Sequence, residues 1–151
     1  MFKVLALIVA VIGAAAAGGA DPFTGVWKLN FEKSQLAPPA PRSVVGHVEC
    51  DGRTISERVE VIDAEGRAST AFVKAAFDGE FYPLIGSPLA DSVRYERIDE
   101  RTIRGTSRKD GKILVTELVV LSEDGRTMTV TYSGTDAQGT PVTGTSVFEK
   151  Q

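Results

Sequence analysis

The sequence predicts an all-β protein, an up-and-down antiparallel β-barrel of about 8–10 strands preceded by a signal-peptide helix. Three observations predict this fold class. Glycine follows a polar residue at regular intervals, as tight hairpin turns require. The segments between these turns are rich in β-branched and aromatic residues, and several alternate apolar with polar side chains. Nearly all connections are short, so strands adjacent in sequence are expected to be adjacent in the sheet.

Residues 1–20 have the pattern of a secretory signal peptide. Lys3 supplies a positive charge, residues 4–12 form an unbroken apolar run, and residues 13–20 are almost all alanine and glycine. The apolar run is short for a membrane span, so we expect cleavage and no stable span afterwards. We therefore expect a signal peptide, 1–20, and a barrel domain, 21–151, in an exported protein that is periplasmic or extracellular.

Turns such as Asp51-Gly52 and Asp110-Gly111 separate the expected strands. Closing the sheet into a barrel removes its two unpaired edges. A two-sheet sandwich is the alternative, but it needs long crossing connections. The longest connection, 32–42, contains three prolines and is expected to be extended. We expect ten strands, at 24–31, 43–50, 54–62, 67–77, 80–84, 91–98, 102–109, 113–121, 126–133 and 140–149.

Charge and cysteine content narrow the function classes. The chain has 17 Lys and Arg against 20 Asp and Glu and shows no basic cluster, so no nucleic-acid partner is expected. Cys50 is the only cysteine, which excludes an internal disulfide. We interpret it as a half-buried small apolar residue, with an intermolecular disulfide or a reactive thiol as alternatives.

No sequence pattern indicates catalysis or metal binding. His47 is the only histidine, whereas a zinc-type site needs several convergent ligands. No Gly-x-Ser-x-Gly elbow accompanies it, so we interpret it as an exposed or hydrogen-bonded strand residue. We expect no catalytic residues, no metal and no cofactor. Paired carboxylates keep a hydrolase-type enzyme open as an alternative.

Two charged residues fall on strand faces that are otherwise apolar. Glu57 lies at an inward position of its strand, and Arg97 is in line with Tyr95. An inward charge costs free energy unless it is paired or solvated, and it can anchor the head group of a ligand. A bulge would instead turn each charge outward, or the two could pair with each other. The candidate ligand-binding residues are Glu57, Tyr82, Tyr95, Arg97, Met128 and Tyr132.

The segment 81–89 is unusually apolar for a loop and contains two prolines. It is compatible with a lid over the barrel mouth or with a plug packed onto one end. We prefer the plug.

The tripeptide Gly25-Val26-Trp27 resembles the Gly-x-Trp signature of the lipocalins. In that family the Trp packs across the closed end of the barrel, so the resemblance implies structural roles for Gly25 and Trp27. The family's Thr-Asp-Tyr motif is missing, and Lys150 is the nearest cation where the family has an arginine. Segments 21–30, 78–86 and 124–130 also look like a group of small uncharacterised exported bacterial proteins labelled lipocalin-like.

These observations predict an exported, non-catalytic protein that binds a small hydrophobic or amphipathic ligand, such as a lipid or fatty acid, in the barrel. The first alternative is a structural or interaction protein of the cell envelope, with a side-chain-filled barrel and an envelope protein as partner. The second is the hydrolase-type enzyme. A hollow barrel favours the ligand-binding protein, a packed interior the interaction protein, and a cleft with converging titratable groups the enzyme.

Overall fold

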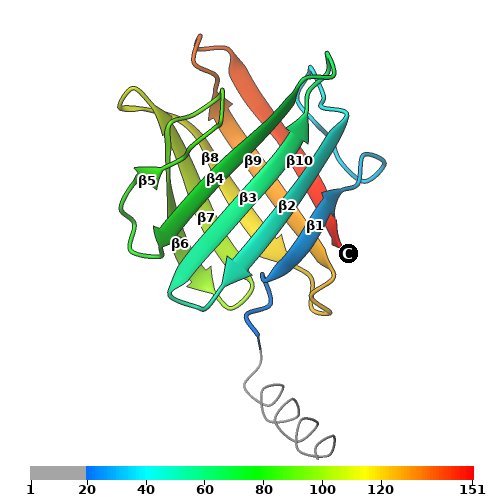
Figure 1. The fold of residues 1–151 in the computed structure, drawn as a ribbon, viewed down its shortest axis with the longest axis vertical. Coiled ribbons are helices and arrows are strands. Elements are labelled where there is room, and N and C mark those ends of the chain that lie inside the picture. Colours follow the sequence, from blue (N-terminus) through cyan, green and yellow to red (C-terminus); the bar gives the residue numbers. More distant parts are fainter. Residues whose placement is uncertain (1–19) are drawn as a thin grey trace, which may run out of the picture.

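A computed structural model describes residues 20–151, which form ten antiparallel strands rolled into a nearly closed barrel (Figure 1). This confirms the predicted fold class, and all ten expected strands are present with similar ends. The signal peptide predicted at 1–20 lies outside the described residues except for Ala20. The strands are β1 (Gly25–Leu29), β2 (Ser43–Cys50), β3 (Thr54–Ile62), β4 (Ala68–Ala76), β5 (Tyr82–Pro83), β6 (Ser92–Asp99), β7 (Thr102–Lys109), β8 (Lys112–Leu121), β9 (Thr127–Thr135) and β10 (Pro141–Lys150).

The sheet is an up-and-down meander that closes through its first and last strands. Each strand hydrogen-bonds the next in sequence, except that β4 and β5 are the two ends of the pairing order, and β1 pairs with β10. The proline-rich connection 32–42 contains no helix, and Gln35 extends the line of β1 by bridging to Thr145 of β10. Among the described residues, no helix is long and apolar enough to span a membrane.

The gap between β4 and β5 is closed by one pair of residues, which we call the seam. Phe72 and Ile85 exchange two backbone hydrogen bonds, of 2.8 and 2.9 Å. β5 contains Pro83, which has no N–H to donate, and such residues are confined to the edges of sheets. The ladder therefore remains short here.

The segment 81–89 is not a plug. Ile85 and Leu89 are 65% and 74% exposed, and the segment runs along the side of the barrel next to β4. Phe81 lies on the outer surface, where the guanidinium groups of Arg94 and Arg108 stand 5.1 and 3.9 Å from its ring centre. The prediction of a plug was wrong because the backbone of this segment closes the sheet along its side. Ile85 and Leu89 therefore lie on the outside, while Tyr82 and Leu84 pack against the core.

Gly86→Ala is expected to weaken the seam. Gly86 has a φ of +84°, and a Cβ there would overlap the backbone carbonyl oxygen of Thr70 on β4. We expect a loss of about 1–3 kcal/mol in the free energy of unfolding, the usual range for forced overlap. Urea denaturation measures it. Gly139→Ala is the matched control, because Gly139 has the same φ of +84° with open space around it. Equal losses in the two variants would show that the overlap at the seam contributes nothing.

One end of the barrel, hereafter the closed end, is filled by aromatic side chains. It is the end where the chain enters at Asp21, the lower end in Figure 1. Trp27 is fully buried and donates its indole N–H to the carbonyl oxygen of Phe23 at 2.9 Å. The ammonium group of Lys150 lies 5.1 Å from the centre of the Trp27 ring and donates a hydrogen bond to the Pro22 carbonyl. The closed end thus joins the first and last strands.

Candidate functional site

The interior of the barrel contains a cavity of about 210 Å³ above the closed end, and this cavity is partly open to solvent. Its walls come from inward positions of β1, β2, β3, β6, β7, β8, β9 and β10, and are mainly apolar. Trp27 lies against it at the closed end. The main aliphatic and aromatic wall residues are Val48, Ile55, Val59, Ile103, Val119 and Phe148.

Glu57 projects into this cavity from β3. The pairing of β3 with both neighbours is regular, with Glu57 opposite Val48 on β2 and Val73 on β4, so no bulge turns it outward. The Tyr95 hydroxyl, from β6, donates a hydrogen bond of 2.8 Å to Glu57 Oε2. This bond crosses the interior between strands that are not adjacent in the sheet.

Glu117, on β8, is a second acid that lines the cavity and that sequence analysis missed. It faces Gly105 on β7 and Tyr132 on β9. A Cβ at Gly105 would lie 2.6 Å from Glu117 Oε1, so glycine leaves the space that the carboxyl occupies. The alternation of apolar and polar residues did not show that Glu117 points inward, because β8 has apolar residues on both of its faces, including the exposed Leu118.

The interior raises the pKa of both acids. Burial raises the pKa of Glu57, and the hydrogen bond from Tyr95 opposes this only in part. Burial and, to a lesser extent, the charge of Glu57 raise the pKa of Glu117 to about 7. Burial and the nearby carboxyls also raise the pKa of Tyr95 well above its usual value. Both acids are half-buried by surface area, and both line the cavity.

Met128 and Tyr132, both on β9, also line the cavity. The Tyr132 hydroxyl accepts a hydrogen bond of 3.1 Å from the backbone N–H of Ala37, in the proline-rich connection. Tyr132 therefore ties that connection to the cavity wall. Ser146 on β10 adds one further hydroxyl.

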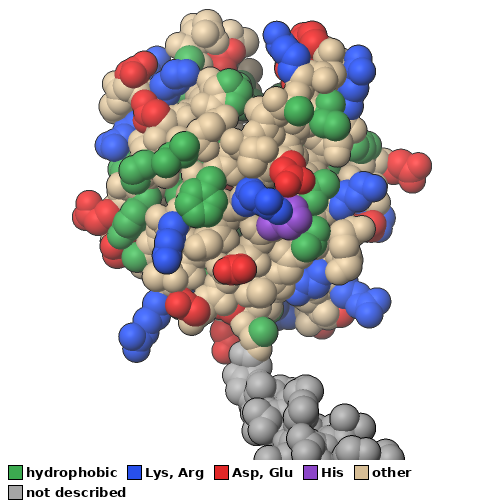
Figure 2. Space-filling model, in the orientation of Figure 1, with side chains coloured by type: hydrophobic (Ala, Val, Ile, Leu, Met, Phe, Trp, Pro, Cys, Tyr) green, Lys and Arg blue, Asp and Glu red, His purple; other side chains and the backbone are tan. Residues whose placement is uncertain are grey.

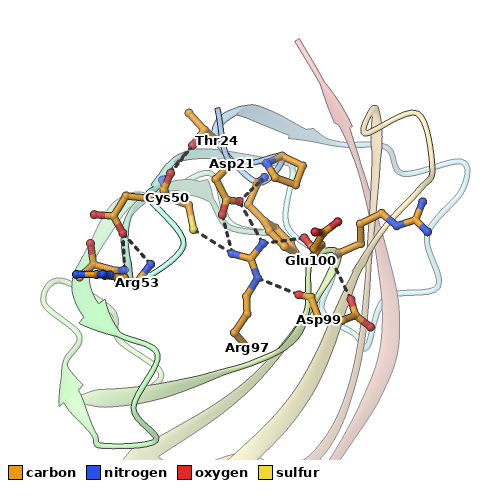
Figure 3. Close-up of polar contacts among 12 residues, drawn as sticks. Asp21, Thr24, Cys50, Arg53, Arg97, Asp99 and Glu100 are labelled. Atoms are coloured by element: carbon orange, nitrogen blue, oxygen red, sulfur yellow. Dashed lines mark hydrogen bonds and ion pairs between the residues drawn. The ribbon is translucent and has the colours of Figure 1, made fainter. Parts of the chain in front are cut away.

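Arg97 points inward but lies at the closed end, outside the cavity lining (Figure 3). It donates to both carboxylate oxygens of Asp21, at 2.7 and 3.4 Å, to Cys50 Sγ at 3.5 Å, and to the carbonyls of Asp99 and Glu100. Arg97 and Glu57 therefore do not pair with each other. A register shift follows Arg97, between it and Asp99, and leaves its own direction inward.

The closed-end cluster of Asp21, Cys50 and Arg97 is a structural arrangement. The Arg97 guanidinium lies 5.0 Å from the ring centre of Phe23 and 5.5 Å from that of Phe77. Burial raises the pKa of Asp21, but the hydrogen bond from Arg97 and other lowering contacts leave it below its usual value. Burial raises the pKa of the Cys50 thiol, which argues against a reactive thiolate.

The other predicted site residues are placed as follows. Tyr82 packs against the core but does not line the cavity, and its hydroxyl donates to Asp78 Oδ2 at 2.6 Å. His47, the single purple side chain in Figure 2, lies on the outer face of β2 with its Nε2 3.7 Å from Glu60 Oε2. Of the six candidates, Glu57, Tyr95, Met128 and Tyr132 meet in one cavity, whereas Tyr82 and Arg97 do not.

Within residues 20–151, no three His, Cys, Asp or Glu side chains are grouped closely enough to hold a metal ion. A comparison with protein-family models finds no match, and a search of curated protein sequences finds none either.

Proposed function

We propose that this protein is an exported, non-catalytic, lipocalin-like protein that binds a small hydrophobic or amphipathic ligand inside the barrel. The observation that carries this proposal is the cavity of about 210 Å³, whose apolar walls hold a few converging polar groups. That combination is typical of small-molecule sites. The signal-peptide pattern of residues 1–20 supports export. The position of Trp27 across the closed end, with Lys150 over its ring, supports the lipocalin-like assignment.

The size of the cavity limits the ligand. A cavity of about 150 Å³ in another protein holds benzene, so this one accommodates roughly six to ten non-hydrogen atoms. Drug-sized pockets occupy about 300–1,000 Å³. A short aliphatic or single-ring compound therefore fits better than a long-chain fatty acid or a complete lipid.

The two alternatives make different demands on the interior. A side-chain-filled barrel that serves only as an interaction protein requires a packed core, and the cavity argues against it. A hydrolase-type enzyme requires converging titratable groups with shifted pKa values, and Glu57 and Glu117 meet that description. Binding is the better proposal because it explains the predominantly apolar walls. Catalysis would instead appear as turnover of small esters or glycosides that Glu117→Gln abolishes.

The test compares the protein with a cavity-filled variant. A Cβ added at Gly46 would find only the Trp27 carbonyl oxygen, 4.0 Å away, so a larger side chain there enters the cavity. We expect 1-hexanol to quench or shift the fluorescence of Trp27, the only tryptophan, in the natural protein. Gly46→Ala should weaken this binding slightly and Gly46→Val about tenfold or more, because each methyl group removes ligand volume.

Native mass spectrometry of the protein purified without detergent provides an independent measurement. A mass excess that disappears on organic extraction, and that is absent in Gly46→Val, would identify a ligand held in the cavity. The proposal fails if 1-hexanol binds the natural protein and Gly46→Val equally well, or binds neither while both remain folded.

A further inference from the structure

We propose that the ligand is a small apolar amine, whose ammonium group lies between the carboxyl groups of Glu57 and Glu117. This inference rests on the proposed ligand-binding function and specifies the chemistry of the ligand. It follows from the charge, the hydrogen-bonding groups and the size of the cavity.

The charged groups that line the cavity are all acidic. Glu57 projects from β3 and Glu117 from β8, and no Lys, Arg or His is among the lining residues. The two cations that stand over lining residues, Arg97 over Phe23 and Lys150 over Trp27, are already engaged. Arg97 forms an ion pair with Asp21 at 2.7 Å, and Lys150 donates to the Pro22 carbonyl. A ligand carboxylate would therefore face two acids without a counter-charge. A ligand cation would instead have two carboxyl groups as counter-charges.

The hydrogen-bonding groups of the cavity also favour a donor. Glu57 accepts one bond, from the Tyr95 hydroxyl, and Glu117 receives none from residues 20–151. The lining offers only three hydroxyl groups, those of Tyr95, Tyr132 and Ser146, as donors. Two carboxyl groups provide more acceptor sites than these hydroxyls can fill. An ammonium group has three N–H donors and a positive charge, and therefore supplies both the donors and the counter-charge that the two carboxyl groups lack.

The remaining walls fit an apolar tail. Trp27 and Phe148 contribute aromatic surface, and Val48, Ile55 and Val119 contribute aliphatic surface. An amine with about six carbons occupies roughly the available volume.

The titration of the acids gives the site a pH dependence. The titratable side chains that face the cavity are Glu57, Glu117, Tyr95 and Tyr132. The pKa of Glu117 lies at about 7, so its carboxyl gains charge between pH 6 and pH 8. An alkylammonium group remains charged throughout that range, because its ordinary pKa is about 10. Amine affinity is therefore expected to rise from pH 6 to pH 8, while the affinity for an alcohol stays nearly constant.

The experiment compares three probes of nearly equal size, hexylamine, 1-hexanol and hexanoate, by calorimetry and by the fluorescence of Trp27. In the natural protein at pH 8, we expect hexylamine to bind about tenfold or more tightly than 1-hexanol, and hexanoate to bind most weakly. The double variant E57Q/E117Q keeps the shape of both side chains and removes their charge. It should lose the preference for the amine, so that hexylamine binds no more tightly than 1-hexanol. E60Q, on the outer face of β3, is the control for general charge.

The possible outcomes separate this inference from the proposed function. If 1-hexanol or hexanoate binds as tightly as hexylamine, the cavity is a ligand site but the amine assignment is wrong. If hexylamine binds E57Q/E117Q and the natural protein equally, the amine lies elsewhere and the assignment is also wrong. If none of the three probes binds, the proposed function itself fails. A urea denaturation transition like that of the natural protein shows that E57Q/E117Q remains folded.

Discussion

Arg97→Met is expected to lower the free energy of unfolding by about 3 kcal/mol, the lower end of the range found when one partner of a buried ion pair is removed, because this pair is part-buried. The side chains of Arg97 and Asp21 are only 18% and 8% exposed. Without Arg97, the Asp21 carboxylate keeps its desolvation cost and loses its counter-charge. The carbonyls of Asp99 and Glu100 lose their donors as well. Methionine keeps much of the apolar contact with Phe23.

Urea denaturation at pH 7 measures this loss, and two further variants identify its cause. Arg67→Met removes an arginine from an exposed pair with Asp63, in which Arg67 is 75% exposed, and should cost less than about 1 kcal/mol. Asp21→Asn combined with Arg97→Met removes both charges and should recover part of the loss. If Arg97→Met cost no more than Arg67→Met, the closed-end ion pair would have no structural importance.

The free energy of unfolding of the natural protein is expected to fall as the pH rises from 5 to 8, and Glu117→Gln is expected to remove most of this loss. Burial raises the pKa of Glu117 from 4.5 to about 7, so the folded protein holds a proton there that the unfolded chain has already released. Between these two pH values the folded state binds more protons than the unfolded state, and stability falls as pH rises. The full shift corresponds to about 3 kcal/mol, lost by pH 8. The raised pKa of Glu57 acts in the same direction.

The measurement is the free energy of unfolding from pH 5 to pH 9, by urea denaturation, for the natural protein and Glu117→Gln. Glutamine has the shape of the protonated acid, so the variant should match the natural protein near pH 5 and exceed it at pH 8. Glu123→Gln removes a carboxyl in the exposed β8–β9 turn and is the control for net charge. If the free energies of unfolding of the natural protein and of Glu117→Gln changed with pH in parallel, the pKa of Glu117 would not be raised in the folded protein.

Strand positions were predictable from the sequence because hairpin turns and side-chain alternation are local signals. Glu57 was placed on the inward face for the same reason, since its neighbours alternate cleanly between apolar and polar residues. Glu117 was not, because β8 is apolar on both faces and alternation carries no information there. Gly105 offered an indirect signal, since a glycine within a strand can leave space for a neighbouring side chain.

Contacts between distant residues were not predictable in the same way. Arg97 was expected to serve a ligand or to pair with Glu57, but its partner is Asp21, 76 residues away in the sequence. Lys150 was noted only as the nearest cation to Trp27, and its place over the ring depends on the pairing of β1 with β10. The size of the cavity depends on every inward side chain together, and no single strand reveals it.

The seam between β4 and β5 determines where the barrel wall is easiest to open. β4 and the segment that contains β5 are joined only by the Phe72–Ile85 bridge, and β5 and β6 by two residue pairs. All other neighbouring strands are joined by three or more residue pairs. Local opening is least costly where the fewest hydrogen bonds are broken. The barrel is therefore a rolled sheet whose two edge strands meet at a single bridge rather than a continuous tube, and local opening is expected to begin at that bridge.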